Sequence, residues 1–287
     1  MLQVQSNLDP AIQYAITTPL TLEFDVDKKI MSKNQSGIFR IYNLAPEIRA
    51  AVFQDPFRIE GGDFRKIAFS AGYESQSQLN LCFAGGINSA SSYRQGPNWI
   101  TEIRAEDGVL GFMSGVVSFQ RPAGWDAAEV IEALCGRMSY GQFGGVGNVV
   151  VNNSRELAAI GSPYELMRSL MGAGQMFYDN GILYGMNDNE YLDKPNALTL
   201  VYGPDNILGS PRRGGTVTHV ETIFEPGAYL GQRVHLTSME PIFNGFWQVR
   251  GLRHSGTISQ GVCGSATTSF TLFRGSNTQL SPVRVVR

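Results

Sequence analysis

The strongest pattern in the chain is a strict alternation of apolar and polar residues over residues 20–27. Leu20, Leu22, Phe24 and Val26 are apolar, and every residue between them is polar. Side chains of a β-strand point alternately to its two faces, so this pattern predicts a strand with one buried and one wet face. Further strands are predicted at residues 38–44, 66–73, 79–87 and 99–105.

Turn and helix patterns separate these strands. Residues 34–37 read Asn-Gln-Ser-Gly, which predicts a turn. Pro46 occupies the tolerated first position of a short helix, whose apolar side carries Ile48 and Val52. Residues 1–124 are therefore predicted to form a β-rich first unit.

The composition changes where two helical patterns begin. Asp126 followed by Glu129 is a capping-box arrangement ahead of an amphipathic helix, and Ser162 caps a second helix. The Asp-Asn-Gly sequence at residues 179–181 lies between two short apolar segments, which predicts a hairpin. Residues 125–207 are predicted to form a small mixed α/β unit.

Residues 208–275 combine short apolar segments with Gly, Pro or Asn residues that close each one. Apolar segments lie at residues 216–224, 245–249 and 267–273. Short strands between regular turns are typical of a small antiparallel barrel or sandwich. Residues 276–287 have no hydrophobic periodicity and are predicted to be a basic C-terminal tail.

The composition is that of an ordinary globular protein. Of the 287 residues, 43% are hydrophobic and 17% are charged, and the 33 glycines indicate many turns. The net charge of -2 excludes a strongly basic duplex-binding surface as the default, although a local basic patch is still compatible with it. Cys82, Cys135 and Cys263 are far apart and in no metal spacing, so we expect buried thiols in a reducing cytosol.

Segments for export or membrane insertion are not recognisable. No N-terminal stretch joins a basic region to an apolar core, and no run reaches the roughly 20 apolar residues that span a bilayer. We therefore expect synthesis and folding in the cytoplasm, without membrane insertion.

Few residues form a chemical motif. His219 and Glu221 make a His-x-Glu, but the Pro-Cys-x-x-Cys of a zinc deaminase does not follow. We expect both side chains to be solvated or barrel-facing rather than metal-bound.

His254 is expected to make a structural hydrogen bond in a turn at a strand end. Residues 144–147 fail the Gly-x-Gly-x-x-Gly spacing and are expected to be a flexible loop.

Acid pairs, thiols and aromatic residues also have ordinary interpretations. The pairs Glu102 with Asp107 and Glu129 with Glu132 are expected to be solvated charges rather than the two acids of a glycosidase. Cys135 lies on an apolar helix side and is expected in the core. The stacking aromatics of a nucleobase site need a Lys/Arg groove, which is missing here, so core or subunit contact is expected for three residues: Phe243, Phe246 and Trp247. The sequence predicts no catalytic, cofactor-binding or metal-binding residue, and no enzyme.

A series of motifs extends over nearly the whole chain. They read FDVDK at 24–28, IFRIYNLAPEIR at 38–49, IAFSAGY at 67–73, FAGGI at 83–87, NWITEIRAEDG at 98–108, LGSP at 208–211, EPGAYLG at 225–231 and FWQVRGLRHSG at 246–256. In order and spacing this combination resembles the baseplate hub proteins of phage tails, the late-control, XkdQ-like group.

The resemblance implies a mainly β fold of the α+β kind, with two tail-tube-like β-barrel domains and the small α/β domain between them. It implies a structural hub in the virion of a contractile or related phage tail, assembled in the host cytoplasm. The hub would form a ring with itself, as a homotrimer, so that three chains supply six barrels. Its other partners would be tail tube or tube-initiator proteins, the central spike and other baseplate proteins, with genomic DNA only in transit through a channel.

The chain lacks an inserted lysozyme, so the resemblance implies no peptidoglycan-cleaving role. Two functions from other classes stay open at this point. One is a virion-associated cell-wall hydrolase, and the other is a nucleic-acid-binding protein.

Overall fold

The chain is mainly β, which confirms the fold class predicted from the sequence. The computed structural model describes all residues except 33, 56–64, 76–77, 109–114, 139–140, 150–152, 173, 195–199, 204–205, 261–263, 275–279 and 286–287. Cys263 and part of the predicted C-terminal tail lie outside the described residues.

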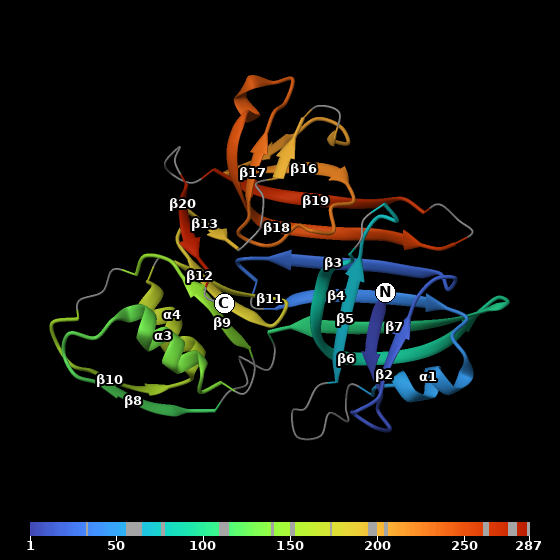
Figure 1. The fold of residues 1–287 in the computed structure, drawn as a ribbon, viewed down its shortest axis with the longest axis horizontal. Coiled ribbons are helices and arrows are strands. Elements are labelled where there is room, and N and C mark those ends of the chain that lie inside the picture. Colours follow the sequence, from blue (N-terminus) through green and yellow to red (C-terminus); the bar gives the residue numbers. More distant parts are fainter. Residues whose placement is uncertain are drawn as a thin grey trace.

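One large sheet organises the fold (Figure 1). Its strands follow one another in the order β15-β16-β19-β18-β3-β4-β7-β6-β5-β1-β2, while β17 pairs with β18 and with β14. The bounds are β1 Leu2–Gln5, β2 Gln13–Ile16, β3 Leu22–Lys29, β4 Gln35–Tyr42, β5 Lys66–Ala71, β6 Asn80–Gln95, β7 Asn98–Asp107, β14 Leu200–Tyr202, β15 Arg212–Gly214, β16 Val217–Ile223, β17 Arg233–Leu236, β18 Gly245–Ile258 and β19 Ala266–Phe273. In the described part of the chain this order is open, ending at β15 and β2, so the two barrels stay a prediction.

The first and third predicted units share this sheet along one seam. β3 pairs antiparallel with β18, from Leu22 opposite Ile258 to Lys29 opposite Gly251. The alternation of residues 20–27 explains why β3 fits there, since its apolar positions are buried and its polar positions lie on the other face. The seam therefore makes one continuous sheet from two stretches at opposite ends of the sequence.

Several predicted boundaries differ from the structure. β18 is one strand with a bulge near Val249, not two segments, and β6 extends well past its predicted end. The turn expected at residues 34–37 is wrong because β4 already begins at Gln35. Residues 281–284 form β20 (Ser281–Arg284), which pairs in parallel with β13 (Glu190–Asp193), so the tail is not wholly irregular.

Two apolar cores lie along the large sheet. The first contains rings from β3, β4, β5 and β6, with the centroids of Phe24 and Phe69 4.9 Å apart. The second lies around β17, β18 and β19 and includes Trp247, Leu252 and Phe270. The predicted helix α1 (Pro46–Val52) is confirmed, and its Val52 belongs to the first core. Figure 1 shows α1 beside the large sheet.

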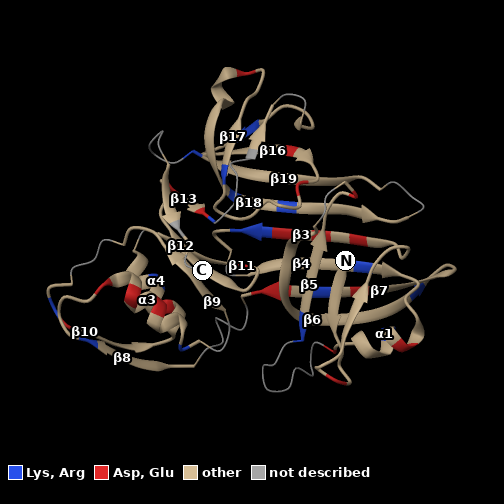
Figure 2. Ribbon diagram, in the orientation of Figure 1, with Lys and Arg blue, Asp and Glu red and all other residues tan. Residues whose placement is uncertain are grey.

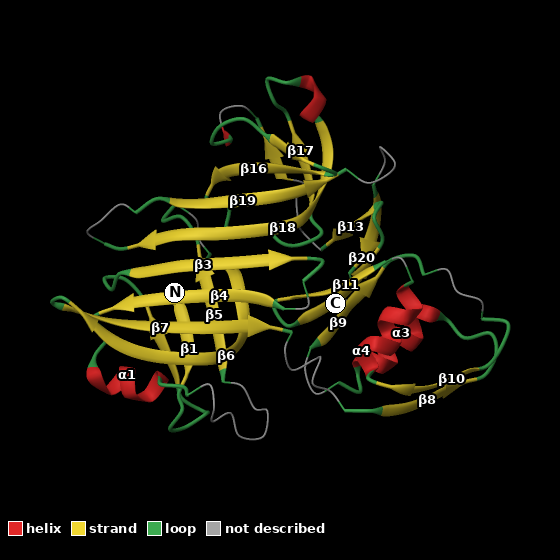
Figure 3. Ribbon diagram, turned by 180° about the vertical axis from the view of Figure 1, so that it is seen from behind, coloured by secondary structure: helices red, strands yellow, loops and turns green. Residues whose placement is uncertain are grey.

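The middle of the chain builds a three-layer unit (Figure 3). Helices α3 (Ala127–Cys135) and α4 (Pro163–Met171) lie between a three-stranded sheet and a two-stranded ribbon. The sheet contains β9 (Gln142–Val146), β11 (Gln175–Asp179) and β12 (Ile182–Met186). The ribbon pairs β8 (Val117–Arg121) with β10 (Leu157–Gly161).

Both predicted helix starts in this unit are confirmed. Asp126 caps α3 by accepting hydrogen bonds from the backbone of Ala128 and Glu129, at 2.8 and 3.0 Å. Ser162 occupies the N-cap position of α4, and Pro163 follows at the first helical position. Among the described residues the Ser162 side chain makes no capping hydrogen bond, so only its position was predicted correctly.

Candidate functional site

A lysine at an inward position of β3 is the first part of the site. The alternation that buries Phe24 and Val26 also directs Lys28 inward, and its side chain is buried. A buried ammonium group needs compensating partners. Lys28 Nζ lies 2.8 Å from Asp179 Oδ1 and donates a second hydrogen bond to Asn180 Oδ1 at 2.8 Å.

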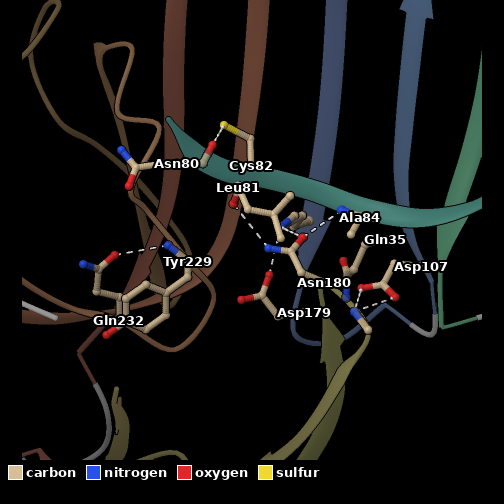
Figure 4. A network of polar contacts seen from close by, with 12 residues as sticks. Gln35, Asn80, Leu81, Cys82, Ala84, Asp107, Asp179, Asn180, Tyr229 and Gln232 are labelled. Atoms are coloured by element: carbon tan, nitrogen blue, oxygen red, sulfur yellow. Dashed lines mark hydrogen bonds and ion pairs between the residues drawn. The ribbon is translucent and has the colours of Figure 1, made fainter. Parts of the chain in front are cut away.

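These partners form the tip of the β11–β12 hairpin of the small unit, which confirms the predicted hairpin. Asn180 and Gly181 have φ angles of 56° and 79°, the left-handed conformation that Asn and Gly adopt most readily. Asn180 Oδ1 also accepts from the backbone of Ala84 at 3.0 Å. Gly181 N donates to both carboxylate oxygens of Asp107 at 3.1 Å. Figure 4 shows the tip reaching β6 and Asp107.

The charges at this tip are balanced. Burial alone would raise the pKa of Asp179, but the ammonium groups of Lys28 and Lys194 outweigh it and hold that pKa below its ordinary value. Lys194 Nζ lies 3.0 Å from Asp179 Oδ2, so each carboxylate oxygen has a cationic partner. Asp179 therefore stays ionised at neutral pH inside the protein.

We call Lys28, Asp107, Asp179, Asn180 and Gly181 the polar junction. It joins β3 and β7 of the large sheet to the small unit through buried, directional contacts. Such contacts allow few alternative placements of the two parts, because any shift leaves a buried charge without its partner. This site was not predicted from the sequence. The clue in the sequence is Lys28, which stands two residues after Val26, where the alternation of β3 predicts another buried side chain.

A second surface lies on the outward side of the large sheet. We call it the polar face, and it carries the outward residues of β16, β19, β18, β3, β4 and β7. Its charged members are Glu23, Asp25, Asp27, Lys29, Arg40, Glu102, Arg104, Glu106, Glu221 and Arg253, and its hydroxyls include Ser255, Thr257, Thr267, Ser269 and Thr271. Figure 2 shows acidic and basic residues interspersed along β3, β4 and β7.

Most of the basic groups on the polar face are paired. The Arg253 guanidinium contacts both oxygens of Asp25 at 2.7 and 2.6 Å. Arg40 and Arg104 each approach Glu102 at 2.8 Å and, against the effect of burial, lower its pKa. Because carboxylates outnumber cationic groups here, the face offers little attraction to phosphate.

Two hollows lie on the polar face. One of about 400 Å³ is bordered by Asp27, Arg212 and His219, and one of about 310 Å³ runs beside Asp25 and Ser255. Their walls carry both signs of charge and hydroxyl groups, without the mainly apolar lining of a small-molecule site.

The histidines occupy different environments. His219 and Glu221 are exposed on one side of β16, as expected for solvated residues. His254 makes the expected structural hydrogen bond, with Nδ1 2.9 Å from Thr268 Oγ1. Its expected place in a turn is wrong, because it is fully buried inside β18. Burial, helped by Lys28, lowers the pKa of His254 to about 3, so the ring is neutral.

The acid pairs divide between solvent and interior. Glu129 and Glu132 are exposed on α3, as expected. Glu102 is half-buried and ion-paired on β7. The expectation of a solvated Asp107 is wrong, because this carboxylate is fully buried in the polar junction.

The glycine-rich stretch is not a loop throughout. Residues 142–146 form β9 and pair in parallel with β12, so the expectation of a flexible loop at residues 144–147 is wrong for its first three residues. A Cβ at Gly144 would overlap the ring of Tyr184 on β12. The glycine is thus explained by close packing of a strand against a ring.

Thiols and aromatic residues mostly belong to the interior. Cys82 and Cys135 are buried, and burial raises the pKa of each thiol to about 11. Phe243 and Trp247 are core residues, and the Trp247 indole donates to the Phe243 carbonyl at 2.9 Å. Phe246 is exposed on β18 and stays a candidate for the expected subunit contact.

Neither a metal cluster nor a membrane-spanning helix is present among the described residues. Within them, no group of three or more His, Cys, Asp or Glu side chains has the arrangement of a metal site. None of the helices in that part of the chain has the length and apolarity to cross a bilayer.

Two solved structures share this fold. The 43 kDa tail protein of prophage MuSo2 from Shewanella oneidensis aligns with a TM-score of 0.62 at 7% identity, covering 98% of each chain. A tail protein from Neisseria meningitidis MC58 aligns with a TM-score of 0.54 at 11% identity, covering 95% of each chain. No curated protein matches the sequence.

The family of the chain is assigned from a match that extends over most of the sequence. The model of the family described as Baseplate hub gp41 matches residues 1–257, which is most of the chain. This match confirms the resemblance to phage baseplate hubs that the motifs indicated. The chain belongs to the Baseplate hub gp41 family.

Proposed function

We propose that this chain is the structural hub that joins a phage tail tube to the central spike and leaves a channel for DNA. The family match over residues 1–257 is the observation that carries the proposal. A hub has to hold its neighbours in fixed positions while the tail transmits force. The polar junction supports this role, because it restrains the small unit against the large sheet through buried charges.

The hub acts as a ring of copies, most simply a homotrimer, in contact with tube or tube-initiator proteins, the spike and other baseplate proteins. Each chain contributes two tube-like units, residues 1–124 and 208–275, with residues 125–207 between them. The two apolar cores on either side of the β3–β18 seam support two units per chain. Three chains would then provide six such units around the channel.

The polar face suits the wall of that channel. DNA is retained by surfaces on which Lys and Arg neutralise its phosphates. On the polar face the arginines are paired with carboxylates, and the excess of carboxylates over cationic groups repels the duplex. The hydroxyl groups of the polar face bind water and carry no charge that would attract phosphate.

Assembly is tested with the full chain and the tube and spike proteins of the same phage. Negative-stain images of the purified chain should show rings of threefold or sixfold symmetry, alone or once spike or tube is added. A chain that stays monomeric and sediments with neither partner contradicts the proposal. Clearing of a peptidoglycan zymogram by the isolated chain would favour the hydrolase instead.

The channel wall is tested in assembled phage. Changing Asp27 and Glu221 to Arg together places new cations on the polar face and should reduce DNA delivery, measured as plating efficiency, with tails still assembled. The matched control changes the exposed Glu129 and Glu132 of α3 to Arg, which adds equal charge elsewhere. Equal plating by both double variants would show that the polar face does not meet DNA.

A further inference from the structure

The C-terminal strand β20 pairs with β13 and, within the described part of the chain, with no other strand. The pair is parallel, from Glu190 opposite Ser281 to Asp193 opposite Arg284, and Figure 1 shows the two strands side by side. Two short strands on their own are marginally stable in water. The other contacts of each strand therefore decide how firmly the pair is held.

β13 is fixed to the rest of the fold without the help of β20. Leu192 N donates to the Gly231 carbonyl at 2.8 Å, and the Leu192 carbonyl accepts from the Tyr229 hydroxyl at 3.3 Å. The Glu190 carbonyl accepts from the side-chain amide of Gln248. The Leu192 side chain is also buried in the second core. These contacts hold β13 in place whether or not β20 is paired with it.

β20 has few attachments of its own. The Val283 side chain is buried in the second core, whereas Ser281 and Pro282 are exposed. Pro282 has no N–H group and cannot donate a hydrogen bond to β13. Val285, just beyond the strand, is partly buried against the same core. Val283 is therefore the main apolar anchor of β20.

The edge of β13 that β20 covers is a preformed strip of backbone donors and acceptors. Alternate residues of a strand direct their backbone groups to opposite sides, so Tyr191 and Asp193 direct theirs away from Gly231 and towards β20. The Asn189 carbonyl lies on this same side and accepts from Ser281 N at 2.8 Å. We call the edge from Asn189 to Asp193, together with the place of the Val283 side chain, the strand groove.

We propose that the strand groove is a docking site for an extended peptide segment and that β20 occupies it reversibly. An exposed strand edge binds an extended segment through main-chain hydrogen bonds, and a pocket for a side chain gives specificity. The segment that fits pairs in parallel with β13 and carries a small branched apolar residue at the Val283 position. When β20 unpairs, a segment of this kind from another protein takes its place. This inference goes beyond the proposed function and depends on neither a ring nor a channel.

The first test measures hydrogen exchange of single amides in the full wild-type chain. After correction for intrinsic rates, the amides of Ser281 and Val283 should exchange at least about 100-fold faster than that of Leu192, because β20 opens while β13 stays bonded to Gly231. Equal protection of the three amides would mean that β20 leaves only when the whole fold opens, which overturns the proposal.

A variant tests the anchor. Val283→Ser should speed exchange in β20 by a further tenfold or so, because the buried apolar group is lost. The matched control is Val201→Ser, which changes an exposed valine of β14, another short strand in a parallel pair, and should leave exchange in β20 unchanged. An equal effect of the two variants contradicts the role of Val283.

The second test measures docking itself. A fluorescent peptide with the sequence of residues 280–285 is titrated with full-length chains, and its anisotropy is followed. The Val283→Ser chain should bind the peptide at least about tenfold more tightly than the wild type, whose own β20 competes at a high effective concentration. The same peptide with Ser in place of Val283 should not bind.

Thermal melting checks that the Val283→Ser chain is folded, and the exchange measured on the wild type decides the matter where it is not. A folded Val283→Ser chain that binds neither peptide at millimolar concentration overturns the docking site. Equal binding of both peptides overturns the specificity for a branched apolar residue.

Discussion

Lys28 Nζ and Asp179 Oδ1 lie 2.8 Å apart, with both side chains almost fully removed from solvent. The two residues are 151 positions apart in the sequence and come from different units of the chain. Their contact fixes the small unit against β3. This contact also predicts that replacing Lys28 and replacing its neighbour Lys29 should change the stability of the protein by very different amounts.

Replacing Lys28 by Met should reduce the free energy of unfolding by about 3 kcal/mol or more, because Asp179 then keeps a buried charge with one cation fewer. Replacing the adjacent Lys29 by Met should change stability little, since Lys29 pairs with Asp27 in solvent. Chemical denaturation of both variants checks this. Equal losses would mean that the buried pair contributes nothing specific.

Acidification below neutral pH should lower the stability of the protein because of His254. Its folded-state pKa of about 3 lies below the ordinary 6.5, so below about pH 6.5 the unfolded chain binds a proton that the native chain does not. Stability therefore rises with pH in this window, and this group should cost about 2 kcal/mol between pH 7 and pH 5. Denaturation midpoints across that range measure the slope.

His254→Gln should flatten this pH dependence, because the titrating group is gone. His219→Gln is the matched control, since His219 is exposed on β16, and it should leave the slope unchanged. Asp179 does not contribute to the change in stability between pH 7 and pH 5. Its lowered pKa means that its contribution is lost only below the ordinary aspartate range, as the pH falls towards its folded-state pKa. An unchanged slope in His254→Gln contradicts the prediction.

The hairpin tip allows backbone and side-chain contributions to be separated. Asn180→Gly keeps the positive φ but removes the acceptor for Lys28 and Ala84, and should cost about 1–3 kcal/mol. Asn180→Ala loses the same contacts and also strains the backbone, so it should cost roughly 1 kcal/mol more. Thermal unfolding of the two variants gives the difference, and equal values would argue that the backbone conformation relaxes.

Two strand glycines should respond differently to a methyl group. Gly144→Ala would force the Tyr184 ring away from β9 and should cost about 1–3 kcal/mol, as overpacking generally does. At Gly161 of β10 the new methyl meets Leu166 only at 3.5 Å, an ordinary contact, so Gly161→Ala should be nearly neutral. Denaturant midpoints compare the two, and a neutral Gly144→Ala would contradict the packing account.

Local patterns in the sequence predicted local structure well. The alternation of residues 20–27 predicted β3, the Asp-Asn-Gly turn predicted the β11–β12 hairpin, and Asp126 predicted the start of α3. Each rests on a preference expressed within a few residues. The resemblance of ordered motifs supplied the family, which no single element could.

Long-range features were not predictable in the same way. Lys28 lies at an inward position of β3, but no residue near it in the sequence identifies Asp179 as its partner, because the two residues are 151 positions apart. Asp107 was expected in solvent because an isolated aspartate at a strand end usually is, but in the folded chain it is buried and accepts hydrogen bonds from Gly181 N of the distant hairpin tip. The apolar segment at residues 245–249 marked only the start of β18, because a bulge near Val249 lets the strand continue through Gly251 to Ile258.

The β3–β18 seam has a consequence for the time at which the protein can fold. β3 is complete once residue 29 has been synthesised, but its partner β18 follows about 230 residues later. At ordinary translation rates that interval is roughly 10–50 s. During it, one edge of β3 has no native strand to pair with and must avoid other chains. Pairing of β3 with β18 is therefore a late event in synthesis, and until then this edge of β3 is open to pairing with the strands of other chains.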